Sequence, residues 1–102
     1  MRSWKLISSV FLFVSITVAQ SQTTLPQAGV IPNEETAIAV AESIFRPVFG
    51  EEQLKKFQPY HAELKDGVWT IYGTLKRGSR GGTPQLRINK KDGRVLEIWH
   101  SR

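Results

Sequence analysis

The chain has 102 residues, a formal net charge of +5 at pH 7, two histidines and no cysteine. This length allows one small domain, and the lack of cysteine excludes a disulfide framework. The charge is uneven, because residues 34–72 hold seven acidic and four basic residues, whereas residues 73–102 hold two acidic and eight basic ones. A basic C-terminal half favours acidic partners.

An apolar run from Leu6 to Ala19 follows the basic residues Arg2 and Lys5. This order is typical of a secretory signal peptide, and Thr17 and Ala19 fit a small-residue cleavage site, so we expect cleavage after Ala19. An uncleaved membrane anchor is the alternative, but the run is shorter than the roughly 20 apolar residues that a span needs. We therefore expect a periplasmic or secreted protein that meets a membrane only during export.

The sequence divides into a signal peptide (residues 1–19), a leader (residues 20–32) and one folded domain (residues 33–102). The leader contains two prolines and one glycine among mostly polar residues. Such a composition predicts an extended or disordered segment.

A helix is predicted from about Glu34 to Phe49. Asn33 can cap its first turn, and the carboxylates that follow suit the positive end of the helix dipole. Apolar residues at helical spacing predict one buried face, formed by Ala37, Ile38, Val40, Ala41, Ile44, Phe45 and Val48. Pro47 and Gly50 favour the end of the helix there, and residues 51–57 are expected to form a charged connector.

From Tyr60 onward the apolar residues alternate, which predicts four strands. Their expected ranges are residues 60–65, 68–75, 85–89 and 94–100. Asp66-Gly67 is a two-residue hairpin signal, and it pairs Leu64 with Trp69 and Ala62 with Ile71.

The turn Lys91-Asp92-Gly93 predicts a type I turn with a bulge at Gly93. That turn pairs Ile88 with Leu96 and Leu86 with Ile98, which places these four residues on the core side. Both turns thus predict a sheet with one apolar face. The fold class is α+β, with one amphipathic helix packed on one face of a four-stranded antiparallel meander.

Several segments occur in a distinctive order: residues 35–42, Pro47–Gly50, Pro59-Tyr60, the hairpin of residues 66–75, Gly81-Gly82 and residues 91–95. In this order they resemble the NTF2-fold immunity proteins (YbbC/YhhH type) of bacterial polymorphic toxin systems, over about Gly29 to His100. The resemblance implies an NTF2- or cystatin-like fold and neutralisation of a toxin by direct binding, with no catalytic residue and no cofactor. Phe49 departs from the family pattern, where a tyrosine is expected.

The residue types that could support catalysis or metal binding are poorly placed for either. His61 and His100 lack a second ligand at metal-binding spacing, so we expect no metal site. The glutamate pairs at residues 34–35 and 51–52 are expected at helix ends open to water, whereas a catalytic carboxylate needs a pocket. We expect a protein that is not an enzyme.

Candidate partner-binding residues fall on the outer face of the sheet and in the loop beside it. Tyr72, Arg87 and Trp99 are assigned to the outer face, and these residue types are enriched at interface hot spots. Lys76, Arg77 and Arg80 lie in a glycine-rich loop, where functional residues often concentrate. We expect this surface to bind a protein toxin with an acidic surface, and we expect no nucleic acid as partner.

Alternative interpretations of these residues stay open. The basic loop can be a solvated hairpin tip, and Tyr72 with Trp99 can pack beneath the leader or form a homodimer contact. At the level of function, the alternatives are a periplasmic PepSY-like housekeeping or hydrolase-inhibiting domain and, less favoured, a small NTF2-like enzyme with a polar cavity.

Overall fold

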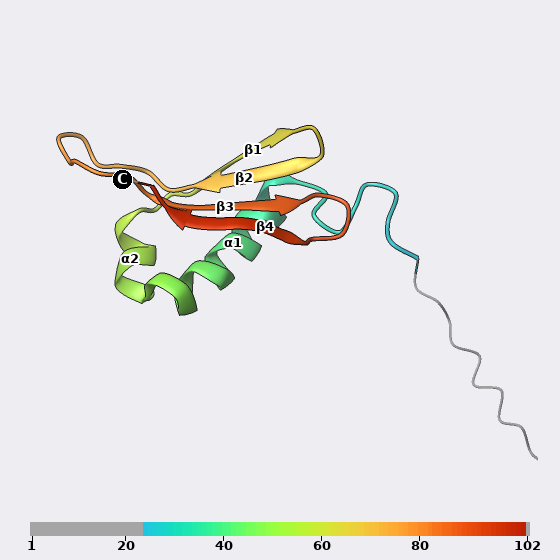
Figure 1. Cartoon of the computed structure of the whole chain (residues 1–102), viewed down its shortest axis with the longest axis horizontal. Coiled ribbons are helices and arrows are strands. Elements are labelled where there is room, and N and C mark those ends of the chain that lie inside the picture. Colours follow the sequence, from blue (N-terminus) through green and yellow to red (C-terminus); the bar gives the residue numbers. More distant parts are fainter. Residues whose placement is uncertain (1–23, 102) are drawn as a thin grey trace, which may run out of the picture.

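The computed structural model describes residues 24–101. Figure 1 shows a twisted sheet with both helices on one side. The elements are α1 (Glu34–Phe49), α2 (Glu51–Lys56), β1 (His61–Lys65), β2 (Val68–Tyr72), β3 (Pro84–Asn89) and β4 (Val95–His100). The strands follow one another in the order β1-β2-β3-β4, with every neighbouring pair antiparallel. This architecture confirms the predicted α+β class with a helix on a four-stranded meander.

The predicted signal peptide and its cleavage site after Ala19 lie outside the described residues. Within residues 24–101, no helix is both long and apolar enough to cross a membrane.

Helix α1 has the predicted bounds because its capping signals are local. The Asn33 side chain accepts a hydrogen bond from the backbone N–H of Thr36 at 2.9 Å, as an N-cap does. At the other end, Gly50 has a φ of 92° and donates its N–H to the carbonyl of Arg46. Pro47 sits in the last turn, so it costs the helix a single backbone bond and does not end it early.

The expected charged connector after α1 is in fact the short helix α2, which corrects the prediction of one helix. Its acidic residues lie in the first turn and its basic residues in the last, matching the helix dipole. Leu54 inserts into the core with only 1% of its surface exposed. The carbonyl of Leu54 accepts the buried hydroxyl of Tyr60 at 3.0 Å, so tertiary contacts hold a segment whose own pattern is too short to predict a helix.

The first hairpin has the predicted register throughout. Leu64 pairs with Trp69, and Ala62 with Ile71. The ring of Tyr60 lies over Gly73, where its Cε1 would be 3.1 Å from a Cβ atom. A two-residue turn permits a single pairing of the strands that it joins, so Asp66-Gly67 alone sets the register.

The second hairpin is only partly as predicted. Leu86 pairs with Ile98 as expected, but the expected pair of Ile88 with Leu96 is wrong, because Ile88 pairs with Val95. The turn closes on Asn89, whose N–H donates to the carbonyl of Arg94. The loop is therefore one residue longer than predicted, and a bulge beyond Ile88 takes up the extra residue.

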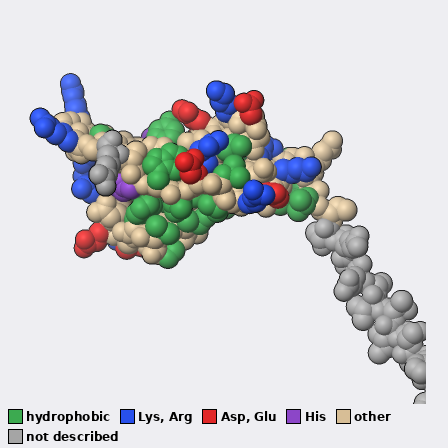
Figure 2. All heavy atoms as spheres, viewed as in Figure 1, with side chains coloured by type: hydrophobic (Ala, Val, Ile, Leu, Met, Phe, Trp, Pro, Cys, Tyr) green, Lys and Arg blue, Asp and Glu red, His purple; other side chains and the backbone are tan. Residues whose placement is uncertain are grey.

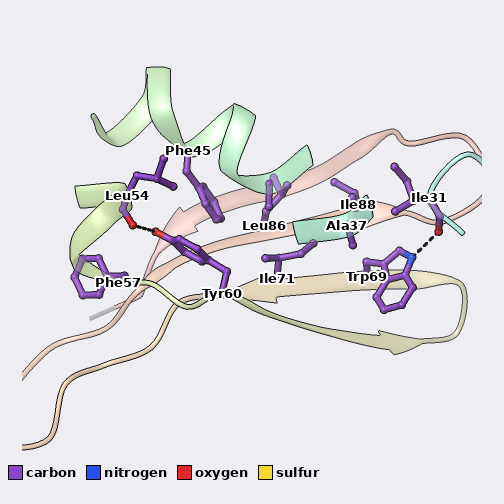
Figure 3. Packing of buried hydrophobic residues seen from close by; sticks show 11 residues of the cluster. Ile31, Ala37, Phe45, Leu54, Phe57, Tyr60, Trp69, Ile71, Leu86 and Ile88 are labelled. Carbon is purple, nitrogen blue, oxygen red and sulfur yellow. Dashed lines mark hydrogen bonds between the residues drawn. The ribbon is translucent and has the colours of Figure 1, made fainter. Parts of the chain in front are cut away.

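The core lies between α1 and the inner faces of β2 and β3 (Figure 3). Phe45, Ile71, Leu86 and Ile88 are each fully buried. The polar atoms of the large aromatic side chains form hydrogen bonds at the edges of the core. For example, the Trp69 indole N–H donates to the carbonyl of Ile31 at 2.8 Å. Every buried polar side-chain atom among the described residues has a hydrogen-bond partner.

The middle of β4 is not covered on its inner face, which corrects the prediction that Leu96 and Ile98 lie in the core. Leu96 is 40% exposed and Ile98 is 36% exposed. At the end of the strand, His100 does pack against Phe49 of α1 and against Phe57. A helix is about 10 Å wide with its side chains, whereas four strands span roughly 14 Å from first to last, so one helix leaves apolar side chains exposed on both edge strands.

Part of the expected leader packs against the domain. The N–H groups of Val30 and Ile31 donate to the carbonyls of Lys91 and Lys90 in the β3–β4 turn. Ile31 belongs to the core and is only 4% exposed. Packing with the domain therefore starts before Asn33.

A pair of leucine-to-alanine variants tests the uneven coverage of the sheet. We expect Leu86→Ala to lower the free energy of unfolding by about 2–5 kcal/mol, because it leaves a cavity in the core. Leu96→Ala should cost no more than about 1 kcal/mol, because 40% of the Leu96 surface is already exposed and no closed cavity forms. Urea unfolding of both variants makes the comparison, and equal losses would contradict the uncovered inner face of β4.

The buried hydroxyl of Tyr60 predicts a pH dependence of stability. Burial, with a smaller contribution from the charge of Glu42, raises the pKa of Tyr60 to about 12. The stabilisation is complete below pH 10 and is lost as the pH rises towards 12, since the unfolded chain then gives up a proton that the folded chain keeps. We expect the stability advantage of the native chain over Tyr60→Phe to shrink across this interval in urea unfolding.

Candidate partner-binding surface

The face of the sheet opposite α1, here called the open face, carries an aromatic row at one end. The strand pairings align His61 with Tyr72, Tyr72 with Gln85, and Gln85 with Trp99. Neighbouring strands are about 4.8 Å apart, so Tyr72 and Trp99 are separated by about 10 Å. His61 and Tyr72 stack with ring centroids 5.4 Å apart. Four strands thus present a continuous flat patch at the end of the sheet.

Tyr72 is held in place by polar contacts on its own side of the sheet. Its hydroxyl donates to the carboxylate of Glu63 at 3.0 Å. This hydrogen bond, more than desolvation or charge, raises the pKa of Tyr72, so the hydroxyl stays protonated. The ring is half-buried. It presents one edge to a partner, together with a hydroxyl oxygen that is held in place and can accept a hydrogen bond.

Arg87 lies in the next row of the open face, where its charge is already paired. It contacts Glu97 at 3.2 Å, its direct partner in the register of β3 and β4. Both side chains remain about half exposed. An exposed pair of this kind adds little stability but can exchange Glu97 for a carboxylate on a partner.

The loop of residues 73–83 leaves the sheet beside the aromatic row. It begins directly after Tyr72 and ends directly before Pro84. Figure 2 shows lysine and arginine side chains projecting from this loop, which protrudes at the left. Lys76, Arg77 and Arg80 are all exposed there.

The two stems of the loop are held by close backbone contacts. Thr74 donates its N–H to the carbonyl of Phe57 at 2.7 Å. A Cβ atom at Gly73 would lie 2.7 Å from the Cβ of Phe57, so only glycine fits between the stem and this ring. On the other stem, Ser101 bonds to Thr83 through its backbone N–H at 3.0 Å. The base of the loop is therefore a defined structure.

The structure thus brings most of the sequence-predicted candidates to one end of the sheet. Tyr72 and Trp99 share a row, the three basic residues lie on the adjoining loop, and Arg87 lies one row further in. Residues 24–31 are held at the opposite end, beside the two hairpin turns, and do not lie beneath these aromatic residues.

Sequence reasoning missed several neighbours of this surface. Glu63 and Gln85 lie beside Tyr72 on the open face, where the predicted register places them, but they were not among the candidate residues. Lys56 reaches the loop from α2, and no signal in the sequence connects these two segments, which lie some twenty residues apart.

The interior of the domain offers little to reaction chemistry. Across residues 24–101, no three histidine, aspartate or glutamate side chains gather as metal ligands. The space beneath α1 is filled by buried apolar side chains. Three surface pockets of the described residues lie at the turns, beside the loop and on the open face.

Comparison with known proteins accounts for this architecture. The family model described as NTF2 fold immunity protein matches residues 36–102. The chain belongs to this family. It is also 25% identical over 75 residues to YhhH of Escherichia coli (strain K12), described as an uncharacterized protein. That match covers 72% of the chain and 59% of the relative, and no solved structure matches significantly.

Membership of the immunity family confirms the resemblance that the order of the motifs indicated. The matched region contains most of α1, both hairpins and the whole basic loop. It therefore includes all six candidate partner-binding residues. Membership of an immunity-protein family suggests a role in binding for this chain. The shared fold does not show which surface makes the contact.

Proposed function

We propose that this protein is an exported immunity protein that neutralises a toxin by stoichiometric binding, through the end of the open face and the basic loop. The observation that carries the proposal is the placement of the aromatic row beside the loop, within the region that matches the immunity family. Tyrosine, tryptophan and arginine supply most hot-spot energy at protein interfaces. Export to the periplasm or beyond follows from the signal-peptide pattern of residues 1–19.

The charge distribution supports an acidic surface on the toxin. The loop side chains and Arg87 are part of the basic C-terminal half, in which residues 73–102 hold eight basic and two acidic residues. Opposite charges on the partner speed association and set its orientation. Export makes nucleic acid an unfavourable partner.

Binding without catalysis is the form of neutralisation that the site supports. The open face is shallow, and the inner side is filled by Phe45, Ile71, Leu86 and Ile88. An NTF2-like enzyme needs an enclosed cavity with an acid or base inside, so this alternative is less favoured. A PepSY-like domain that inhibits a resident envelope hydrolase remains the runner-up, because it could use the same face.

Single substitutions on the open face test the proposal. We expect Trp99→Ala to weaken capture of the partner at least tenfold, because it removes the largest aromatic ring of the open face, and Arg87→Glu to weaken it similarly through charge repulsion. The tagged full chain is expressed in its native cells, and partners are co-purified from envelope extracts after challenge by neighbouring strains.

Lys91→Glu is the matched control, because it makes the same charge change at the far end of the sheet. The recovered partner must be toxic when expressed alone and harmless when expressed with the native chain. Recovery of only a resident hydrolase favours the runner-up. Full protection by both open-face variants contradicts the assigned surface.

We also propose that two copies associate through β4. The backbone N–H of Ser101 points towards the β3 side of the strand, because it donates to the carbonyl of Thr83. Along an antiparallel strand the direction of the backbone polar groups alternates from residue to residue, so those of Ile98 and His100 point away from β3, to a free edge. Beneath this edge Leu96 and Ile98 leave an apolar strip, and Figure 2 shows hydrophobic side chains gathered between β4 and the helices. Two antiparallel β4 strands would satisfy both edges about a two-fold axis.

A lysine on this edge should prevent self-association. We expect the native chain to show a concentration-dependent increase in mass by light scattering, and Leu96→Lys to stay monomeric. Leu64→Lys is the control, because Leu64 is also apolar and 47% exposed but lies on the other edge strand, β1. A native chain that stays monomeric, or equal behaviour of both variants, contradicts the proposal.

A further inference from the structure

A small pocket lies between the end of α2 and the basic loop. Three cationic side chains line it, together with two apolar residues and one hydroxyl: Lys56, Lys76, Arg80, Phe57, Leu75 and Ser79. Its volume is about 60 Å³. Since one water molecule needs roughly 10–15 Å³ of such space, the pocket admits a group of a few heavy atoms.

The three cations of this pocket have no ionic partner among the described residues. The ion pairs formed by residues 24–101 are Arg46 with Glu51 and Arg87 with Glu97. Like charges around one small space repel each other, and an anion among them lowers this cost. The arrangement therefore fits a negatively charged occupant.

Both walls of the pocket are held in place before anything binds. Lys56 packs its ammonium group over the ring of Phe57, 5.4 Å from the ring centroid. The carbonyl of Phe57 accepts the N–H of Thr74, which ties this wall to the loop stem at 2.7 Å. Within the loop, Ser79 donates its N–H to the carbonyl of Lys76 at 2.9 Å, closing a turn that carries the other cations. A preformed site loses less entropy on binding.

We propose that this cationic pocket receives a carboxylate side chain of the protein partner; the inference rests on the proposed function. The apolar walls of Phe57 and Leu75 suit the short hydrocarbon stem of a glutamate or aspartate, and the cations suit its head group. The pocket lies on the helix side of the loop, because Phe57 belongs to the core. A partner that also contacts the aromatic row, on the other side of the loop, therefore contacts the loop from both sides.

Two basic residues outside the pocket provide matched controls. Lys55 precedes Lys56 on α2, and Arg94 lies directly before β4 at the far end of the sheet, and neither lines the pocket. Replacing Lys55, Lys56, Arg80 or Arg94 by glutamine removes one positive charge in each case. Only substitutions that line the pocket should affect a carboxylate held inside it.

The test is an NMR titration of the protein purified from cells that express the full chain, with a capped tetraglutamate peptide as the probe at physiological salt. We expect saturable shifts of the backbone amides of Lys76 and Ser79. Lys56→Gln and Arg80→Gln should each weaken binding about fivefold or more, and Lys55→Gln and Arg94→Gln less than twofold. Tetraglutamine and inorganic phosphate are titrated in parallel.

Each other result overturns the proposal. Equal weakening by all four variants would mean diffuse attraction to a basic loop, and the absence of saturable shifts would mean that no site exists. Tighter binding of phosphate than of tetraglutamate would assign the pocket to a phosphate group. The titration needs no toxin, so its failure is distinguishable from failure of the co-purification with Trp99→Ala.

Discussion

One helix must bury the apolar face of a four-stranded sheet, and the rest of the structure depends on this constraint. Helix α1 places the fully buried Phe45 over β2 and β3, where Ile71, Leu86 and Ile88 complete the core. Such a core is small, so the domain adds contacts at its margins. Leu54 from α2 and Ile31 from the N-terminal segment are both buried there, and the hydrogen bonds of Tyr60 and Trp69 tie them to the sheet.

The same constraint separates the surfaces available for binding. The helix covers the inner faces of β2 and β3 and leaves Leu64 on β1, and Leu96 and Ile98 on β4, partly exposed. The open face has no helix over it in the described structure, as Figure 1 shows, and it carries aromatic and charged residues in rows. Under the two proposals above, the toxin would bind the open face and the second copy would bind the free edge of β4.

The basic loop joins these surfaces because its stems are rigid while its tip is exposed. Glycine at position 73 lets the stem lie against Phe57, and Ser101 holds the other stem at Thr83. The loop residues divide by position, since Lys76 and Arg80 face the cationic pocket and Arg77 does not line it. Loops on a rigid scaffold commonly carry function for this reason.

The sequence by itself determined the features that depend on neighbouring residues. Asn33 and Gly50 set the bounds of α1, and Asp66-Gly67 set the register that aligns His61 with Tyr72, because a cap and a two-residue turn act within a few residues. Part of the candidate surface follows from that alignment and from the pairing of Gln85 with Trp99.

Only the tertiary structure decided the bulge beyond Ile88, the helix at residues 51–56, the exposure of Leu96 and the meeting of Lys56 with Arg80. Each of these depends on the width of a helix against a sheet or on contacts between residues far apart in the chain, which no local pattern records.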